Sequence, residues 1–257
     1  MEQNSQALAG KHAVVTGGAR GIGAAVTRAL VAHGANVTML GRSAAAPANL
    51  TGDPHLHYAQ GDVCQPESLG KAFESARSSF GPIHVLVNNA GQGSSAPFLK
   101  TDFALWRSMM RVNLDGTFHC IHQVLPAMIG AGWGRIVNIA STAGLVGYGY
   151  VTAYCAAKHG VIGLTRSLAL EVASKGVTVN AVCPGYTETE MLQRTIEGIV
   201  AKTGRTAAEA RAELSARNPQ KRMVQPEEVA NAVAWLCLPG SEAITGQSIA
   251  VAGGEVM

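Results

Sequence analysis

The sequence predicts an α/β protein: a single Rossmann-type, doubly wound domain over residues 1–257, with a seven-stranded parallel sheet, helices on both faces and a small helical flap. Three observations support this fold class. Short runs rich in Val, Ile and Leu alternate with helical patterns, which is typical of a parallel sheet buried on both faces. A glycine-rich turn, TGGARGIG, follows the first of these runs. No linker rich in Pro, Ser and Gly divides the 257 residues, a length that suits one large domain.

The order of the elements follows from this alternation. We expect strands at 12–16, 36–40, 56–60, 83–89, 135–141, 177–182 and 248–254. Helices are expected between them, at 21–33, 66–80, 103–129, 152–174 and 226–238. The insertion 186–218 is rich in Thr, Glu, Arg and Ala, and its segment TAAEARAEL has a helical pattern. We therefore interpret this insertion as a helical flap over the substrate site and not as a second domain.

The glycine-rich turn lies directly after the first expected strand and directly before the first expected helix. Gly17, Gly21 and Gly23 allow a tight turn, a close approach to a pyrophosphate and packing of the helix on the strand. The N-terminus of the helix then points its free N–H groups at the phosphates. Because no Gly-Lys-Ser/Thr follows, the turn predicts a dinucleotide site and disfavours a nucleoside-triphosphate loop.

The end of the second expected strand, TMLGRS, indicates which dinucleotide fits. An Asp or Glu at this point normally holds the 2′-hydroxyl of NAD(H), but no acid occurs from Gly10 through Gly52. Arg42 offers a guanidinium and Ser43 a hydroxyl, both suited to a 2′-phosphate, and Arg20 in the glycine turn adds a second positive charge. The sequence thus favours NADP(H) over NAD(H).

Tyr154 and Lys158 stand four residues apart in TAYCAAKHGVIG, so on a helix they share one face. Such a pair adds little to helix stability but suits an enzyme that moves a proton near neutral pH. Free tyrosine has a pKa of about 10, and we expect Lys158, together with the positive charge of oxidised nicotinamide, to lower it. Ser141 ends an expected strand, where open α/β sheets bind ligands, and its hydroxyl can hold the substrate oxygen.

Taken in order, these motifs resemble those of the short-chain dehydrogenase/reductase family over nearly the whole chain. The matching segments are TGGARGIG, Asp62-Val63, NNAG (88–91), NLDG with Asn113, IAS with Ser141, YCAAK, and PGYTET from Pro184 with Thr187. The resemblance implies hydride transfer between a nicotinamide and a carbonyl or alcohol carbon, with Asn113 holding a water that returns protons to Lys158. The implied catalytic residues are Asn113, Ser141, Tyr154 and Lys158. The expected cofactor-binding residues are Gly17, Arg20, Gly21, Ile22, Gly23, Arg42, Ser43, Asp62, Val63, Asn89, Ala90, Gly91, Tyr154, Lys158, Pro184, Gly185 and Thr187.

The residues expected to line the substrate site are mostly apolar or small: Gln92, Gly93, Ser141, Leu145, Tyr148, Tyr150, Tyr186 and Met191. No Lys or Arg occurs in 142–153, which disfavours a small charged keto acid. NAVCPGYTETEM and RMVQPEEVA resemble segments of 3-oxoacyl-thioester reductases and polyketide ketoreductases. The first hypothesis is an NADP(H)-dependent reductase of a 3-oxoacyl thioester or similar ketone. The alternatives are an oxidative dehydrogenase of a hydroxyacyl-CoA, hydroxysteroid or other secondary alcohol, and a non-catalytic NADP(H)-sensing regulator.

Composition excludes several other classes of function. Twenty Lys and Arg against 17 Asp and Glu, without like-charge blocks, disfavour nucleic acid. No run approaches the roughly 18 apolar residues of a membrane span. The polar N-terminus is no secretory signal, and five dispersed cysteines without a CxxC indicate a reduced, cytoplasmic protein. His119 and His122 lack further ligands, so no metal is expected. Family resemblance implies a homotetramer formed through the helices at 103–129 and 152–174.

Overall fold

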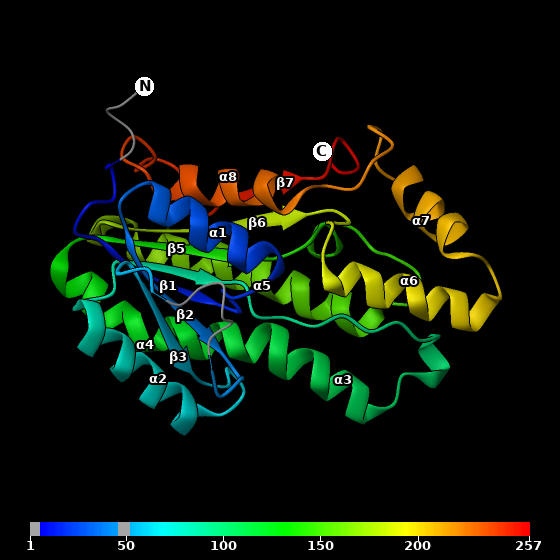
Figure 1. Cartoon of the computed structure of the whole chain (residues 1–257), viewed down its shortest axis with the longest axis horizontal. Coiled ribbons are helices and arrows are strands. Elements are labelled where there is room, and N and C mark those ends of the chain that lie inside the picture. The colour runs from blue at the N-terminus through cyan, green and yellow to red at the C-terminus, as the bar shows by residue number, and fades with distance from the viewer. Residues whose placement is uncertain (1–5, 46–51) are drawn as a thin grey trace.

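The computed structural model describes residues 6–45 and 52–257. Seven strands form one parallel sheet in the order β3-β2-β1-β4-β5-β6-β7, which confirms the predicted fold class (Figure 1). Every neighbouring pair of strands is parallel. The strands are β1 (His12–Thr16), β2 (Asn36–Gly41), β3 (Leu56–Gln60), β4 (Val85–Asn88), β5 (Gly134–Ile139), β6 (Val177–Pro184) and β7 (Ser248–Val251).

Helices cover both faces of the sheet, as its near-continuous apolar strands require. On one face, α1 (Gly21–Ala32) and α8 (Pro226–Cys237) pack against each other and bury one apolar cluster with the strands. On the other face lie α2 (Pro66–Phe80), α4 (Gly116–Ala131) and α5 (Thr152–Val172), which bury the second large cluster (Figure 1). The core is therefore two apolar layers with the sheet between them.

The helix expected at 103–129 is interrupted, which corrects the sequence prediction. It consists of α3 (Phe103–Met110), a π-helical turn (Arg111–Asp115) and α4, which ends at Ala131. The side chain of Asn113, within the π-helical turn, donates from Nδ2 to the carbonyl oxygen of Met109 at 3.0 Å. Single-turn π-bulges of this kind occur frequently at functional sites.

For many of the other helices and strands, the first or last residue differs by a few positions from the expected one. β7 stops at Val251, not at 254, because Gly253 and Gly254 have φ values of 60° and 91° and leave the extended region. β6 continues beyond the expected 182, so that Pro184 is its last residue. These shifts leave the order of the elements unchanged.

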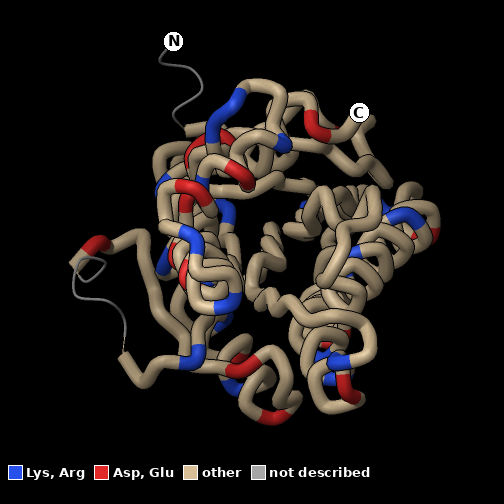
Figure 2. Tube along the Cα trace, turned by 90° about the vertical axis from the view of Figure 1, so that its right-hand side faces the viewer, with Lys and Arg blue, Asp and Glu red and all other residues tan. Residues whose placement is uncertain are grey.

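The insertion 186–218 contains α6 (Glu190–Thr203) and α7 (Ala207–Ala216), which project from the sheet at one end of the molecule (Figure 1). The two helices share a small apolar cluster of their own: Leu192, Ile196, Ala210, Leu214 and Met223. Lys and Arg residues are interspersed with Asp and Glu residues along the chain (Figure 2). Among the described residues, no helix combines the length and the apolar character that crossing a bilayer requires.

Candidate active site

A cleft of about 1550 Å³ opens at the carboxyl ends of the strands. The strand order reverses between β1 and β4, and open α/β sheets bind ligands in the crevice at such a switch point. The glycine turn and the ends of β4 and β5 form one side, and α6 and the residues that precede it form the other. Single small-molecule pockets usually measure roughly 300–1,000 Å³. The cleft therefore has room for a dinucleotide and a second molecule.

Most of the residues expected at the site do line this cleft. They are Gly17, Arg20, Gly21, Ile22, Arg42, Ser43, Asp62, Val63, Asn89, Ala90, Gly91, Gln92, Gly93, Asn113, Ser141, Tyr148, Tyr154, Lys158, Pro184, Gly185, Tyr186, Thr187 and Met191. They come from segments far apart in the sequence, and the sheet topology brings them together.

Three expected residues do not line the cleft. Leu145 is half-buried and packs on the apolar cluster between α5 and β6. Tyr150 is 70% exposed in a loop with φ of 68°, and its carbonyl oxygen accepts from the backbone N–H of Ala96 at 2.8 Å. A Cβ atom on Gly23 would lie 2.2 Å from the carbonyl oxygen of Gly17, so this glycine permits close packing of α1 on the turn.

The glycine turn has the properties that a bound pyrophosphate requires. Gly17 and Gly21 adopt φ values of 64° and 51°, which favour glycine over other residues. Arg20 caps α1 without a side-chain hydrogen bond, and no acid occurs in the first turn of the helix. The first N–H groups of α1 are thus available to an anion at the positive end of the helix dipole.

Asn89 holds the glycine turn against β4. Its Nδ2 donates to the carbonyl oxygen of Thr16 at 2.9 Å. The hydroxyl of Thr16 in turn accepts the backbone N–H groups of Asn89 and Ala90, each at 2.9 Å. The turn and the NNAG segment therefore form one rigid floor of the cleft.

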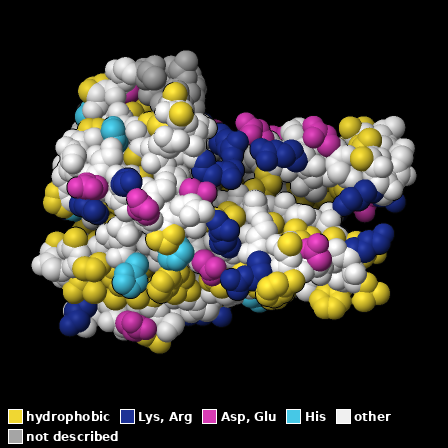
Figure 3. Space-filling model, turned by 90° about the horizontal axis from the view of Figure 1, so that it is seen from below, with side chains coloured by type: hydrophobic (Ala, Val, Ile, Leu, Met, Phe, Trp, Pro, Cys, Tyr) yellow, Lys and Arg dark blue, Asp and Glu magenta, His cyan; other side chains and the backbone are white. Residues whose placement is uncertain are grey.

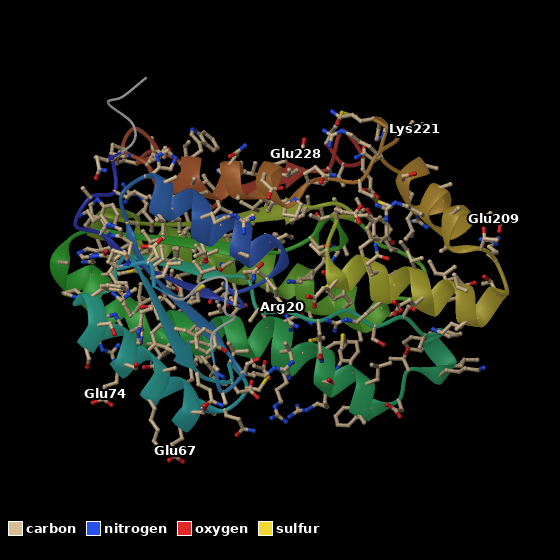
Figure 4. All side chains as sticks on the ribbon, in the orientation of Figure 1. Arg20, Glu67, Glu74, Glu209, Lys221 and Glu228 are labelled. Atoms are coloured by element: carbon tan, nitrogen blue, oxygen red, sulfur yellow. The ribbon has the colours of Figure 1, made fainter. Side chains whose placement is uncertain are left out.

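The two arginines expected at a 2′-phosphate are in different situations. Arg42 is exposed at the edge of the cleft, and among the described residues its guanidinium has no carboxylate partner. Arg20 instead pairs with Glu190 of α6, Nη1 to Oε2 at 3.4 Å, and lies between α1 and α6 near the middle of the molecule (Figure 4). A 2′-phosphate would meet Arg42 without first breaking an ion pair.

The side chains of Ser141, Tyr154 and Lys158 converge at the end of β5. The hydroxyl of Ser141 lies near the phenol of Tyr154 and acts to lower its pKa, and Ser141 Oγ accepts the backbone N–H of Ala143 at 3.1 Å. Lys158 lies 5.7 Å from the centroid of the Tyr154 ring, and its Nζ donates to the carbonyl oxygen of Ile139 at 2.8 Å. Since α5 places Tyr154 and Lys158 one turn apart, both reach the same wall of the cleft.

Asn113 joins the π-helical turn to the loop that follows NNAG. Its Nδ2 also donates to the carbonyl oxygen of Gln92 at 3.0 Å, and its Oδ1 accepts the backbone N–H of Gln92 at 3.2 Å. A Cβ atom on Gly91 would lie 2.9 Å from Asn113 Oδ1 and 3.7 Å from Lys158 Nζ. Glycine at this position therefore leaves room for the amide of Asn113 and the ammonium of Lys158 on either side of the backbone. The water that the family resemblance implies between Asn113 and Lys158 stays a prediction.

In the chain alone, burial outweighs the lowering of the Tyr154 pKa that is expected from Lys158, and the joint effect of Lys158 and oxidised nicotinamide stays a prediction. Burial raises the pKa of Tyr154 to about 12, and the nearby hydroxyl of Ser141 opposes the rise only in part. Burial also lowers the pKa of Lys158 to about 8, because a charged amine loses its hydration there. The phenol is therefore protonated at neutral pH, which is the form that a proton donor must have before it reacts.

Several cleft residues escaped the sequence reasoning. Arg107 and Arg111 reach the cleft from α3 and the π-helical turn, and Arg194 and Lys202 reach it from α6. A helical periodicity was the available signal, because Ala104, Arg107, Ser108 and Arg111 follow the i, i+3, i+4, i+7 pattern of one helix face. The lack of Lys and Arg in 142–153 therefore does not mean that the cleft lacks positive charge.

Comparison with known proteins settles the family. The model of the family described as "short chain dehydrogenase" matches residues 11–200. The chain belongs to this family. It is an oxidoreductase that acts on ketone and alcohol carbons, and the family binds a nicotinamide cofactor.

Similar proteins cover nearly the whole chain. The 3-oxoacyl-(acyl-carrier-protein) reductase FabG of Aquifex aeolicus is 38% identical, over 96% of this chain and 98% of that protein. The D-beta-hydroxybutyrate dehydrogenase of Rhizobium meliloti is 36% identical, over 95% of this chain and 98% of that protein. A crystal structure of a point variant of the actinorhodin polyketide ketoreductase with NADPH superposes with a TM-score of 0.90 at 37% identity, covering 95% of this chain and 97% of that chain.

Proposed function

We propose that this protein is an NADPH-dependent reductase of a 3-oxoacyl thioester or a similar apolar ketone. The observation that carries the proposal is the convergence of three cleft residues at the carboxyl end of β5: Ser141, Tyr154 and Lys158, whose Nζ lies 5.7 Å from the centroid of the Tyr154 ring. Reduction of a ketone needs a proton donor at the carbonyl oxygen, and the phenol of Tyr154 supplies one.

Three side chains perform the proton chemistry. Ser141 donates its hydroxyl hydrogen to the substrate oxygen and stabilises the charge that develops there. Tyr154 transfers its proton to that oxygen, and the ammonium of Lys158 stabilises the phenolate left behind. When bound, NADPH would supply the hydride that reduces the carbonyl carbon to a secondary alcohol. Gly17, Gly21 and the N-terminus of α1 would hold the pyrophosphate.

The choice of NADPH rests on the end of β2. Arg42 provides a guanidinium there without a carboxylate partner among the described residues, and the segment from Gly10 through Gly52 contains no acid to hold a 2′-hydroxyl. The similar ketoreductase was solved with NADPH. Both facts support the phosphorylated dinucleotide.

The substrate class rests on the cleft wall and on the similar proteins. Tyr148, Tyr186 and Met191 present apolar surface to the cleft, and two similar proteins are named as 3-oxoacyl and polyketide ketone reductases. The second candidate is an oxidative dehydrogenase of a secondary alcohol. The similarity to D-beta-hydroxybutyrate dehydrogenase favours it, as do Arg107 and Lys202, which bring cations to the cleft from outside 142–153.

A matched panel separates the two candidates. Nicotinamide absorbance is followed with acetoacetyl thioesters and polycyclic ketones in the reducing direction, and with 3-hydroxybutyrate and its thioester in the oxidising direction, each with NADP(H) and NAD(H). We expect the largest kcat/KM for a 3-oxoacyl thioester with NADPH. A larger value for free 3-hydroxybutyrate with NAD⁺ would replace the first candidate by the second.

The organisation of the protein completes the proposal. Residues 1–257 act as one catalytic domain, in which 186–218 cover the substrate site, and four copies assemble. Support for assembly comes from Phe118 on α4 and Leu170 on α5, apolar side chains that the single chain leaves exposed. Light scattering coupled to size-exclusion chromatography measures the mass, and a monomer would contradict the tetramer.

A further inference from the structure

An arginine pair on α3 and the π-helical turn, Arg107 and Arg111, lies beside the cleft and has no role in the chemistry above. Both side chains are exposed and line the cleft, one helical turn apart. Like charges at this spacing repel each other and cost helix stability. Among the described residues neither guanidinium has a carboxylate partner; Arg107 contacts the ring of Phe103, at 5.8 Å. An arrangement that costs stability and remains unpaired suits an anionic ligand.

The charge of the cleft as a whole points the same way. Its described lining contains seven basic residues, Arg20, Arg42, Arg107, Arg111, Lys158, Arg194 and Lys202, and two acids, Asp62 and Glu190. The two acids are already engaged: Glu190 pairs with Arg20 and Arg194, and Asp62 accepts the backbone N–H of Cys64. Lys and Arg side chains gather around the hollowed middle of the face seen from below (Figure 3). The cleft thus attracts anions beyond those that α1 and Arg42 would neutralise.

Hydrogen bonds link the segment that carries the arginine pair to the loop after NNAG and, through this loop, to the flap. Ser108, between the two arginines in sequence, accepts a hydrogen bond from Gln92 Nε2 at 2.7 Å, which ties α3 to the loop after NNAG. Further along that loop, Lys202 of α6 donates to the carbonyl oxygen of Ser95 at 3.0 Å. The loop therefore connects the segment that carries the pair to the flap.

We propose that Arg107 and Arg111 bind a phosphate of the carrier on which the acyl substrate is delivered, so that the enzyme prefers a phosphate-bearing thioester to a neutral one. The inference rests on the proposed function for the nature of the acyl cargo. A guanidinium fork binds phosphate through charge-assisted, paired hydrogen bonds. A phosphate of the dinucleotide would accept the same hydrogen bonds, and the experiment distinguishes this phosphate from one on the acyl carrier.

The test measures binding without turnover, with the full chain saturated with NADPH. Calorimetry at low salt compares coenzyme A, which carries phosphates, with pantetheine, which carries none. We expect the wild-type protein to bind coenzyme A roughly tenfold more tightly, and Arg107→Gln/Arg111→Gln to lose that difference. The matched control is Arg77→Gln/Lys175→Gln, which removes two exposed charges outside the cleft and should keep the difference.

Each other outcome has a defined meaning. Equal binding of the two probes by wild type, or a difference that persists in the double variant, overturns the proposal. If the double variant loses NADPH affinity by as large a factor as it loses coenzyme A affinity, the pair binds a phosphate of the cofactor. That result also overturns the proposal. Turnover tests the proposed function separately: if the pair distinguishes coenzyme A from pantetheine but no thioester is reduced, the phosphate site stands and the proposed reaction fails.

Discussion

The two walls of the cleft differ in how they are held. On the sheet wall, formed by the strand ends, the π-helical turn and α5, Lys158 is 5% exposed and Asn113 is 1% exposed. On the flap wall, formed by α6 and the residues before it, Met191 is 42% exposed. The proton chemistry therefore lies on the wall with almost no freedom to move, and substrate contacts lie on the wall with more. Function divides accordingly: we expect the sheet wall to set the rate of the chemical step and the flap wall to set affinity and selectivity.

The contacts inside each wall explain the difference. Asn88 donates to Asn138, and Asn138 donates to Thr165, each at 2.9 Å and with all three residues buried between β4, β5 and α5. Leaving such buried groups unpaired is costly. The flap wall depends on its small apolar cluster and on partly exposed ion pairs such as Arg211–Glu188, and exposed pairs of this kind contribute little.

The largest effect is expected at the proton donor of the sheet wall. Tyr154→Phe removes the hydroxyl and leaves the ring in place. We expect kcat for ketone reduction to fall at least roughly a hundredfold, because general acid catalysis contributes about that much or more. NADPH affinity, measured by fluorescence titration, should change less than twofold. Activity near the wild-type level would remove Tyr154 from its role.

A second change breaks the buried polar chain behind the catalytic residues. Asn138→Ala leaves Nδ2 of Asn88 without a partner and removes one hydrogen bond from Thr165, whose hydroxyl still donates to the carbonyl oxygen of Val161. The free energy of unfolding should therefore fall by about 1–3 kcal/mol. Urea denaturation followed by circular dichroism measures it. The same replacement at the exposed Asn36–His55 hydrogen bond, Asn36→Ala, should cost less than about 0.5 kcal/mol. Equal losses of unfolding free energy in the two variants would mean that this chain of hydrogen bonds does not stabilise the sheet wall.

The cofactor preference should follow the charge at the edge of the sheet wall. Arg42→Asp exchanges a group that attracts a 2′-phosphate for one that repels it and that can bind a 2′-hydroxyl. The ratio of kcat/KM for NADPH to that for NADH is expected to fall roughly tenfold or more. Arg77→Asp makes the same change of charge far from the cleft and should leave the ratio unaltered. An unchanged ratio in Arg42→Asp would place the 2′-phosphate elsewhere.

The sequence was sufficient for what depends on local pattern and chain order. It predicted the seven strands, the glycine turn and the positions of Ser141 and Lys158, because parallel topology brings strand ends together whatever lies between them. It missed the π-helical turn, in which Asn113 forms hydrogen bonds with Gln92 and Met109, and it did not anticipate that burial raises the pKa of Tyr154 in the chain alone. Neither long-range packing nor desolvation is visible in a run of residues.

The pH dependence of the free enzyme should report the burial of Lys158. Its pKa, about 8 in the folded protein, lies below the ordinary lysine value. The ammonium that supports proton donation is therefore present below pH 8 and is lost as the pH rises through it. We expect kcat/KM for NADPH to fall toward tenfold per pH unit above about 8. Stability has the opposite trend, since the unfolded chain binds the extra proton between about 8 and 10.5, and the penalty for burying the charge disappears over that range. A flat kcat/KM profile from pH 7 to 10 would contradict this assignment.

The smallest effect is expected on the flap wall, and it decides whether the two walls are functionally distinct. Met191→Ala removes apolar surface from a partly exposed position at the cleft, so an apolar ketone should bind less well while the catalytic residues keep their geometry. We expect KM for the ketone to rise about threefold with kcat within twofold of wild type, in steady-state kinetics at saturating NADPH. Trp235→Ala, at a position of α8 that is 46% exposed and outside the cleft, is the matched control and should leave KM unchanged. If Met191→Ala lowers kcat as strongly as it raises KM, the flap also positions the reacting carbonyl, and the division between a catalytic wall and a binding wall does not hold.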